Sequence, residues 1–107
     1  MFEYTGQTTN TETITLGSIN IPLGQARVLR ATWRGTADNL ACGGILSVLA
    51  KNANGTVSIV GSFGGVAVTE GGLAVTFDLV ANSSGVSVTA LGTAGTLVNW
   101  TALVEVL

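Results

Sequence analysis

A chain of 107 residues with four basic residues, six acidic residues and a net charge of −2 lacks the dense basic surface that nucleic-acid binding requires. Only 9% of the residues are charged, against about 25% in an average soluble domain, while 47% are apolar. The length predicts a single domain, and the scarcity of charge predicts that another protein covers part of its surface.

The first segment, residues 1–24, is rich in threonine and shows little apolar periodicity, so we expect an extended N-terminal arm that leads into the first strand or strands. Such a segment is either a frayed terminus or an arm that docks on a neighbouring subunit. Phe2 and Tyr4 lie within it and would anchor the arm on a partner. No basic region followed by an apolar stretch is present, so we expect no secretory signal. The remaining residues, 25–107, are expected to form the core of the fold.

Alternation becomes clear in residues 25–34. Leu29 and Trp33 point to one side of the expected strand, whereas Arg30 and Arg34 lie on the polar side. We expect the two arginines to be solvated or to lie in an interface. Residues 35–39 are polar and predict a turn.

Residues 44–52 form the most ambiguous element, because their apolar spacing fits a strand or one face of a short helix. The Asn54-Gly55 pair that follows is a strong hairpin turn sequence, and residues 56–60 continue as a β-rich run. We therefore predict a strand on each side of this turn.

Glycine-rich turns separate the later elements. Gly64-Gly65 is expected to end one strand before a short strand over residues 66–69, and further strands are expected over residues 73–81, 86–91 and 96–106. On the last of these, Trp100 faces the apolar side, and Leu97 and Leu103 face the other side. These two leucines would be awkward exposures in a monomer.

Seven or eight strands with this spacing and no long helix predict an all-β, single-domain β-sandwich, of the jelly-roll or immunoglobulin-like type. The longest mainly apolar run, residues 40–50, is about half the length of a membrane-spanning helix. We therefore expect no membrane insertion.

Catalytic and metal-binding patterns are not found in the sequence. There is no histidine, the carboxylates are scattered singly, and the only cysteine, Cys42, has no base to activate it. We expect no enzyme activity, no cofactor and no metal site, and we interpret Cys42 as a small buried apolar side chain.

The two tryptophans, Trp33 and Trp100, share strand faces with aliphatic residues, so we expect them in the core. The alternative is a carbohydrate-binding module, in which Trp33, Trp100 or Tyr4 would be exposed as a stacking platform for a glycan of a host surface.

Several runs together resemble small β-rich modules of tailed-bacteriophage virions, which are found at the ends of tail fibres and in other exterior virion proteins. In this pattern a basic strand precedes a hairpin, a GVSVTALG strand follows, and a tryptophan lies on the last strand. The resemblance covers residues 26–106 and is carried by residues 27–35 (RVLRATWRG), 45–51 (ILSVLAK), 52–61 (NANGTVSIVG), 77–81 (FDLVA), 85–92 (GVSVTALG) and 98–102 (VNWTA).

The resemblance implies a non-catalytic virion protein that is assembled in the host cytoplasm, lies on the virion exterior, and associates with itself as a homotrimer and with capsid or tail proteins. Residues 1–24 contain neither heptads nor collagen-like triplets that would build a shaft, which favours a capsid decoration or cement protein docked through its arm or rim. The alternative is a tail-fibre or receptor-binding module that contacts the host. The expected interface residues are Phe2, Tyr4, Arg30, Arg34, Leu97 and Leu103.

Overall fold

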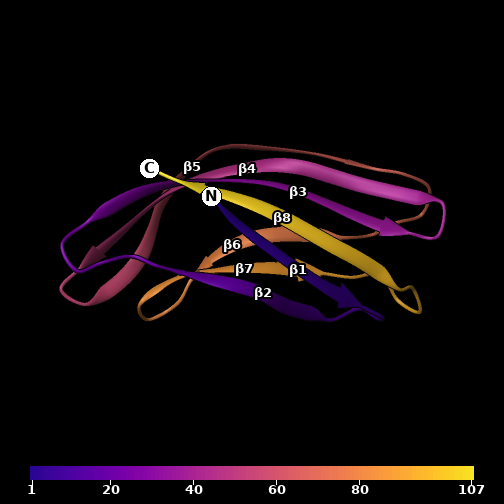
Figure 1. Cartoon of the computed structure of the whole chain (residues 1–107), viewed down its shortest axis with the longest axis horizontal. Helices are drawn as coiled ribbons and strands as arrows, with labels where there is room; N and C mark the ends of the chain where they lie inside the picture. Colours follow the sequence, from indigo (N-terminus) through magenta and orange to yellow (C-terminus); the bar gives the residue numbers. More distant parts are fainter.

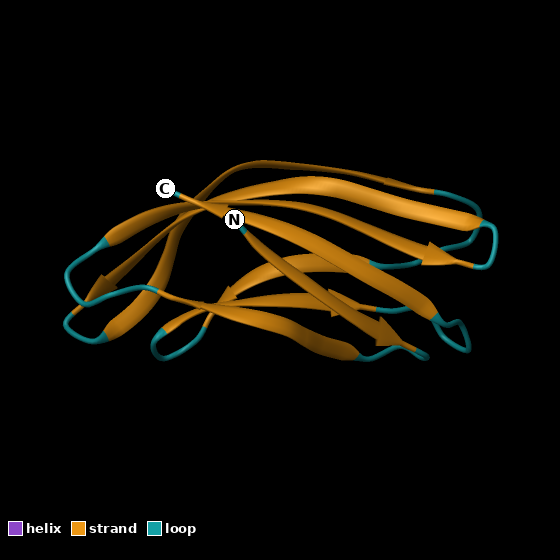
Figure 2. Cartoon of the chain, in the orientation of Figure 1, coloured by secondary structure: helices purple, strands orange, loops and turns teal.

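The computed structural model describes all 107 residues as eight β-strands joined by short loops (Figure 1), with no helix (Figure 2). The molecule is elongated, with principal extents of 44 × 21 × 20 Å. No helix that could cross a membrane is found. The strands are β1 (Phe2–Thr8), β2 (Thr13–Asn20), β3 (Ala26–Ala37), β4 (Leu40–Ala53), β5 (Thr56–Thr69), β6 (Thr76–Ala81), β7 (Gly85–Leu91) and β8 (Val98–Val106).

The strands form two antiparallel sheets that pack face to face (Figure 1). The five-stranded sheet has the order β1-β8-β3-β4-β5, and the three-stranded sheet has the order β2-β7-β6. The predicted all-β sandwich is confirmed, and the ambiguous segment at residues 44–52 lies within a strand, β4.

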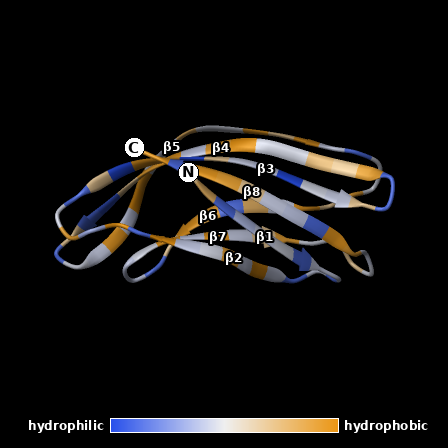
Figure 3. Cartoon of the chain, viewed as in Figure 1, coloured by the Kyte–Doolittle hydropathy of each residue, from blue (hydrophilic) through white to orange (hydrophobic).

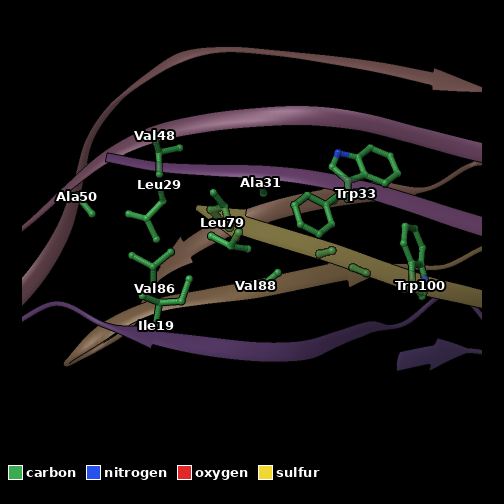
Figure 4. Packing of buried hydrophobic residues seen from close by; sticks show 14 of the residues in the cluster. Ile19, Leu29, Ala31, Trp33, Val48, Ala50, Leu79, Val86, Val88 and Trp100 are labelled. Carbon is green, nitrogen blue, oxygen red and sulfur yellow. The ribbon is translucent and has the colours of Figure 1, made fainter. Parts of the chain in front are cut away.

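The core fills the space between the sheets. Leu29 and Trp33 reach down from the five-stranded sheet, and Leu79 and Val86 reach up from the three-stranded sheet (Figure 4). The Trp33 ring stacks on Phe77 with a centroid distance of 5.2 Å, and it lies 5.8 Å from the Trp100 ring at a tilt of 41°. The prediction that both tryptophans belong to the core is confirmed, since their exposed fractions are 7% and 2%.

A buried hydrogen bond attaches β1 to the core. The indole Nε1 of Trp100 donates to Oγ1 of Thr8 at 3.0 Å, and Thr8 is fully buried. This bond satisfies two polar groups that would otherwise be desolvated without partners.

Residues 1–24 do not form a separate arm. β1 pairs with β8 along its whole length, and β2 pairs with β7. Ile19 and Ile21 are buried in the core, and the Tyr4 ring lies against Gly17 of β2, where a Cβ atom would overlap the ring. Threonine is a favourable strand residue, so a polar, threonine-rich segment can complete a sheet without apolar periodicity of its own.

The turn between β4 and β5 agrees with the prediction. Asn54 and Gly55 have φ values of 57° and 87°, the positive pair that a two-residue type I′ hairpin turn requires. The turn between β3 and β4 is shorter than expected, because β3 continues to Ala37 and only Asp38 and Asn39 lie outside the strands.

Glycine positions explain two further departures from the predicted elements. Gly35 lies inside β3, where a Cβ atom would come within 2.7 Å of the Cys42 Sγ atom, so this glycine provides packing space and not a turn. The Gly64-Gly65 pair does not end a strand, because β5 continues through it. The pairing of β5 with β4 shifts register opposite Ser47/Val48 and Leu49/Ala50 of β4. These shifts are β-bulges, which bend a strand without ending it.

Two predicted strands begin later than expected. β6 starts at Thr76, whereas the prediction began at Leu73, which is buried although it lies in a loop. β8 starts at Val98, so Leu97 belongs to the preceding loop.

Candidate interaction surface

One side of the five-stranded sheet faces away from the three-stranded sheet and carries most of the exposed apolar side chains found within the strands. Because side chains alternate along a strand, residues next to buried Ala31 and Trp33 point to this side, and so do their partners on neighbouring strands. We call this surface the outer face. Its central residues are Arg30, Thr32, Arg34, Ile45, Val66, Val68 and Leu103.

A mainly apolar row, with Thr32 as its one polar member, crosses the outer face and is called the apolar row. Leu103 pairs with Thr32, Thr32 with Ile45, and Ile45 with Val66, so the row runs over β8, β3, β4 and β5. Leu103 is 37% exposed, Val66 is 69% exposed, and neighbouring Val68 is 77% exposed. Hydrophobic and near-neutral residues continue along most of β4 (Figure 3). A connected apolar surface of this kind marks a protein contact more often than an isolated exposed residue does.

A shallow hollow lies on the outer face beside this row. Its lining includes Arg30, Ile45, Ser47 and Val66, and the Phe63 ring stands at its edge with 66% of its surface exposed. The hollow combines a guanidinium group with an aromatic and two aliphatic side chains, a combination that is enriched in the centres of protein interfaces.

The two sheets differ in the chemistry of their outward sides. Arg30 pairs with Glu105 and Arg34 with Thr101 across β3 and β8, so charged and polar groups flank the apolar row. On the outward side of the three-stranded sheet, Thr89 pairs with Thr15 on one neighbouring strand and with Asp78 on the other. Val80 is the exposed large apolar side chain of this sheet. The outer face of the five-stranded sheet is therefore the more apolar of the two.

The structure brings together three of the six interface residues expected from sequence. Arg30, Arg34 and Leu103 share the outer face, whereas Leu97 lies in the loop before β8, where it is 48% exposed. Phe63, Val66 and Val68 also lie on this surface, although the sequence predicts only a short strand over residues 66–69 and no interface role for them. Their alternate spacing in a glycine-rich run resembles a short buried strand, and only the place of β5 in the sheet order shows that it is exposed.

Phe2 and Tyr4 lie on the opposite side of β1 from the outer face. Their rings stack at 6.4 Å, and the Tyr4 hydroxyl donates to the Ser18 carbonyl at 3.5 Å. Burial raises the pKa of the Tyr4 phenol above its usual value. Tyr4 thus contacts β2 of the same chain, while Phe2 remains 48% exposed at the edge of the sheet.

An open groove lies beneath β5, between the two sheets. It has a volume of about 250 Å³ and is lined mainly by apolar residues, among them Trp33, Leu46 and Phe77. The groove exists because the residues of β5 that face it, Gly65 and Ala67, are too small to fill it. No carboxylate, amine or thiol lines this groove.

The remaining reactive groups are isolated. Cys42 is buried, its thiol donates to the Gly35 carbonyl at 3.6 Å, and burial raises its pKa, so little reactive thiolate forms near neutral pH. No group of three histidine, cysteine or acidic side chains is placed to hold a metal ion.

The alternative of a carbohydrate-binding module required an exposed aromatic platform. Trp33 and Trp100 are both buried, so neither can stack on a sugar ring. Tyr4 packs against Gly17, which leaves its ring without a free flat face on that side.

Comparisons with known proteins give a distant structural similarity. No family model and no curated protein matches the sequence. Among solved structures, the chain is similar to the tailspike protein of Acinetobacter phage vB_ApiP_P1, with a TM-score of 0.43 and 18% sequence identity over 95% of this chain. The chain spans 22% of the length of that protein.

Proposed function

We propose that this chain is a non-catalytic structural protein of a bacteriophage virion, an exterior module of the capsid decoration or cement type that associates with itself. The exposed apolar row on the outer face carries the proposal of self-association. The virion context rests on the resemblance of residues 26–106 to β-rich phage modules.

Leu103 is the centre of the proposed self-contact. It lies between Glu3 of β1 and Thr32 of β3 in the pairing of the sheet, with Arg34 diagonal to it. A second copy that covers this position would remove the leucine from water and leave the charged groups at the rim, which is the usual arrangement of a protein interface. Three copies is the number that the resemblance implies.

Docking on the particle would then use the rim of the sandwich. Residues 2–8 and 13–20 are incorporated in the two sheets, so the first 24 residues do not provide a free arm. Phe2 and Leu97, each 48% exposed, lie outside the outer face and are the proposed rim contacts with a capsid or tail protein. Several copies in one assembly would make a weak single contact effectively long-lived.

The mass of the protein in solution tests self-association. We expect light scattering at micromolar concentration to give an assembly heavier than the 10.8 kDa single chain. Leu103→Asp should lower that mass, because it places a carboxylate in the contact. Val80→Asp, the same kind of change on the outward side of the other sheet, is the control and should leave the mass unchanged. A wild-type monomer, or equal masses for the wild-type and Leu103→Asp chains, would contradict the proposal.

Co-sedimentation with particles tests the location. The purified chain is mixed separately with capsids and with tails from which exterior proteins have been stripped. Binding to capsids is expected for a decoration protein, whereas binding to tails together with binding to host cells would support the tail-fibre alternative. Failure to bind either particle would contradict a virion role.

A further inference from the structure

The free edge of β5 differs from the other three sheet edges. β1 is seven residues long and carries Glu3, β6 is six residues long and carries Asp78, and β2 has a register irregularity between Thr15 and Gly17. Short length, charge and bulges are the features that prevent edge strands from pairing with other chains. β5 is 14 residues long, and its sequence contains neither a charged residue nor a proline. Its two bulges lie before Gly64, so they leave the edge regular from Gly64 to Thr69.

Nothing in the chain covers the second half of β5. Every residue from Val60 to Thr69 is exposed, and the side chains on both sides of the strand share this exposure. β5 forms the outermost strand of its sheet, along the upper rim of the molecule (Figure 1). An exposed, uncharged edge of this length is a template for another β-strand.

The direction of the backbone groups identifies the residues that are free to pair. The Glu70 amide donates to the Ala41 carbonyl of β4 at 3.0 Å, and a Cβ atom on Gly44 of β4 would collide with the Val66 carbonyl oxygen. Glu70, Val68 and Val66 therefore direct their backbone groups toward β4. Since this direction alternates in an antiparallel ladder, Thr69, Ala67 and Gly65 direct theirs to the open edge.

We propose that β5 pairs antiparallel with β5 of a second copy of this chain, with a two-fold axis at Ala67. Ala67 then lies opposite the second copy's Ala67, and Gly65 lies opposite its Thr69. The amide and carbonyl of all three residues find partners. The five-stranded sheets of the two copies become one continuous sheet.

The side chains favour a second copy as the partner. In this register Val66 lies opposite the second copy's Val68 on the outer face, and such pairs of β-branched residues stabilise neighbouring strands. Self-pairing brings any charge on a strand close to the same charge on its copy, and β5 has none. The pairing also extends the apolar row from Leu103 to Val66 into the second copy.

This contact goes beyond the proposed function and is separate from it. It uses the edge of β5 and two-fold symmetry, whereas the self-contact at Leu103 uses the outer face. A change at Leu103 and a change at Ala67 therefore report on different contacts.

Cross-linking tests the proposed register. In a chain with Cys42→Ala, which removes the native thiol, Ala67→Cys should form a disulfide-linked pair of chains under mild oxidation, because the Cα atoms of a hydrogen-bonded antiparallel pair lie about 5.5 Å apart. Thr5→Cys in the same background places a thiol on the edge strand β1 and is the control. Cross-linking of Ala67→Cys that is no faster than that of Thr5→Cys would overturn the proposal.

A proline variant tests the backbone pairing with the fold kept intact. Ala67→Pro removes an N–H that points to the open edge and leaves the ladder with β4 in place. The variant is compared with Ala67→Ser, which keeps the N–H, and both changes are made in the Leu103→Asp chain. Sedimentation should give the mass of two chains for the Ala67→Ser variant and the mass of one chain for the Ala67→Pro variant. If both double variants form pairs, or if both remain single chains, the edge contact is overturned. This result does not depend on whether Leu103 takes part in the self-contact on the outer face.

Discussion

β8 and β5 have similar apolar sequences but very different surroundings. β8 lies between β1 and β3, and its inward residues Val98, Trp100 and Val104 are at most 2% exposed. β5 lies at the end of the same sheet, and none of its residues from Val60 onward is buried. The comparison shows that two properties, which composition does not reveal, decide whether a valine belongs to the core or to the surface: the side of the sheet that it faces and the position of its strand in the sheet order.

The exposure of the inward side of β5 follows from the unequal width of the two sheets. Three strands spaced about 4.8 Å apart cannot cover five. At the β1 edge the Tyr4 ring closes the gap by packing on Gly17 of β2. At the β5 edge the inward residues are small, and the open groove above Phe77 remains.

A matched pair of valine substitutions tests this difference with the largest expected effect. Val104→Ala on β8 should reduce the free energy of unfolding by about 2 kcal/mol, because it removes two buried methyl groups and leaves a cavity. Val68→Ala on β5 should change it by less than about 0.5 kcal/mol, since Val68 is 77% exposed. Urea unfolding at high dilution, where copies are separated, measures both.

Equal losses for the two variants would contradict the assignment of Val68 as an exposed side chain of β5. A loss for Val68→Ala that appears only at high protein concentration would sharpen it, because the side chain would then be buried by a second copy and not by its own chain.

A smaller effect is expected from the cysteine of β4. Burial raises the pKa of the Cys42 thiol, so the folded chain retains a proton that the unfolded chain releases. Its contribution to stability is complete below the ordinary thiol pKa of about 8.5 and is lost as the pH rises through the folded value. Under reducing conditions, the urea concentration at the midpoint of unfolding should therefore decrease as the pH is raised from neutral to alkaline.

Cys42→Ala provides the control for this titration. In this variant the urea midpoint should no longer decrease near the thiol pKa. A decrease that begins above about pH 10 should remain, because burial also raises the pKa of Tyr4. An unchanged decline in the Cys42→Ala chain would show that the thiol is not the group that titrates.

The local pattern of the sequence predicted the parts of the fold that depend on near neighbours. The alternation around Trp33 and Trp100 identified core faces, and the Asn54-Gly55 pair identified a hairpin, because each depends on residues a few positions apart. The start of the chain could not be interpreted in this way, since β1 is held by β8 at the other end of the sequence.

The candidate interaction surface was predictable only in part. Leu103 stands out in the sequence because it is apolar on the polar side of its strand, whereas Arg30 and Arg34 stand out as charged residues on the polar side of theirs. Phe63, Val66 and Val68 were not found, because a valine-rich strand in the interior of a sheet and one at its edge have the same sequence pattern. Gly64 and Gly65 predicted a break, but the backbone bends at a bulge and continues as the free edge.

Amide hydrogen exchange along β5 tests the central claim most directly, because it measures the free edge residue by residue. The amides of Val66 and Val68, which face β4, should be protected at all concentrations. The amides of Gly65, Ala67 and Thr69 should be protected at high protein concentration and should exchange rapidly on dilution. In the Ala67→Pro chain, which cannot pair and has no amide at position 67, the amides of Gly65 and Thr69 should exchange rapidly at every concentration. Rapid exchange of these three amides at every concentration at which the chain self-associates would contradict the account.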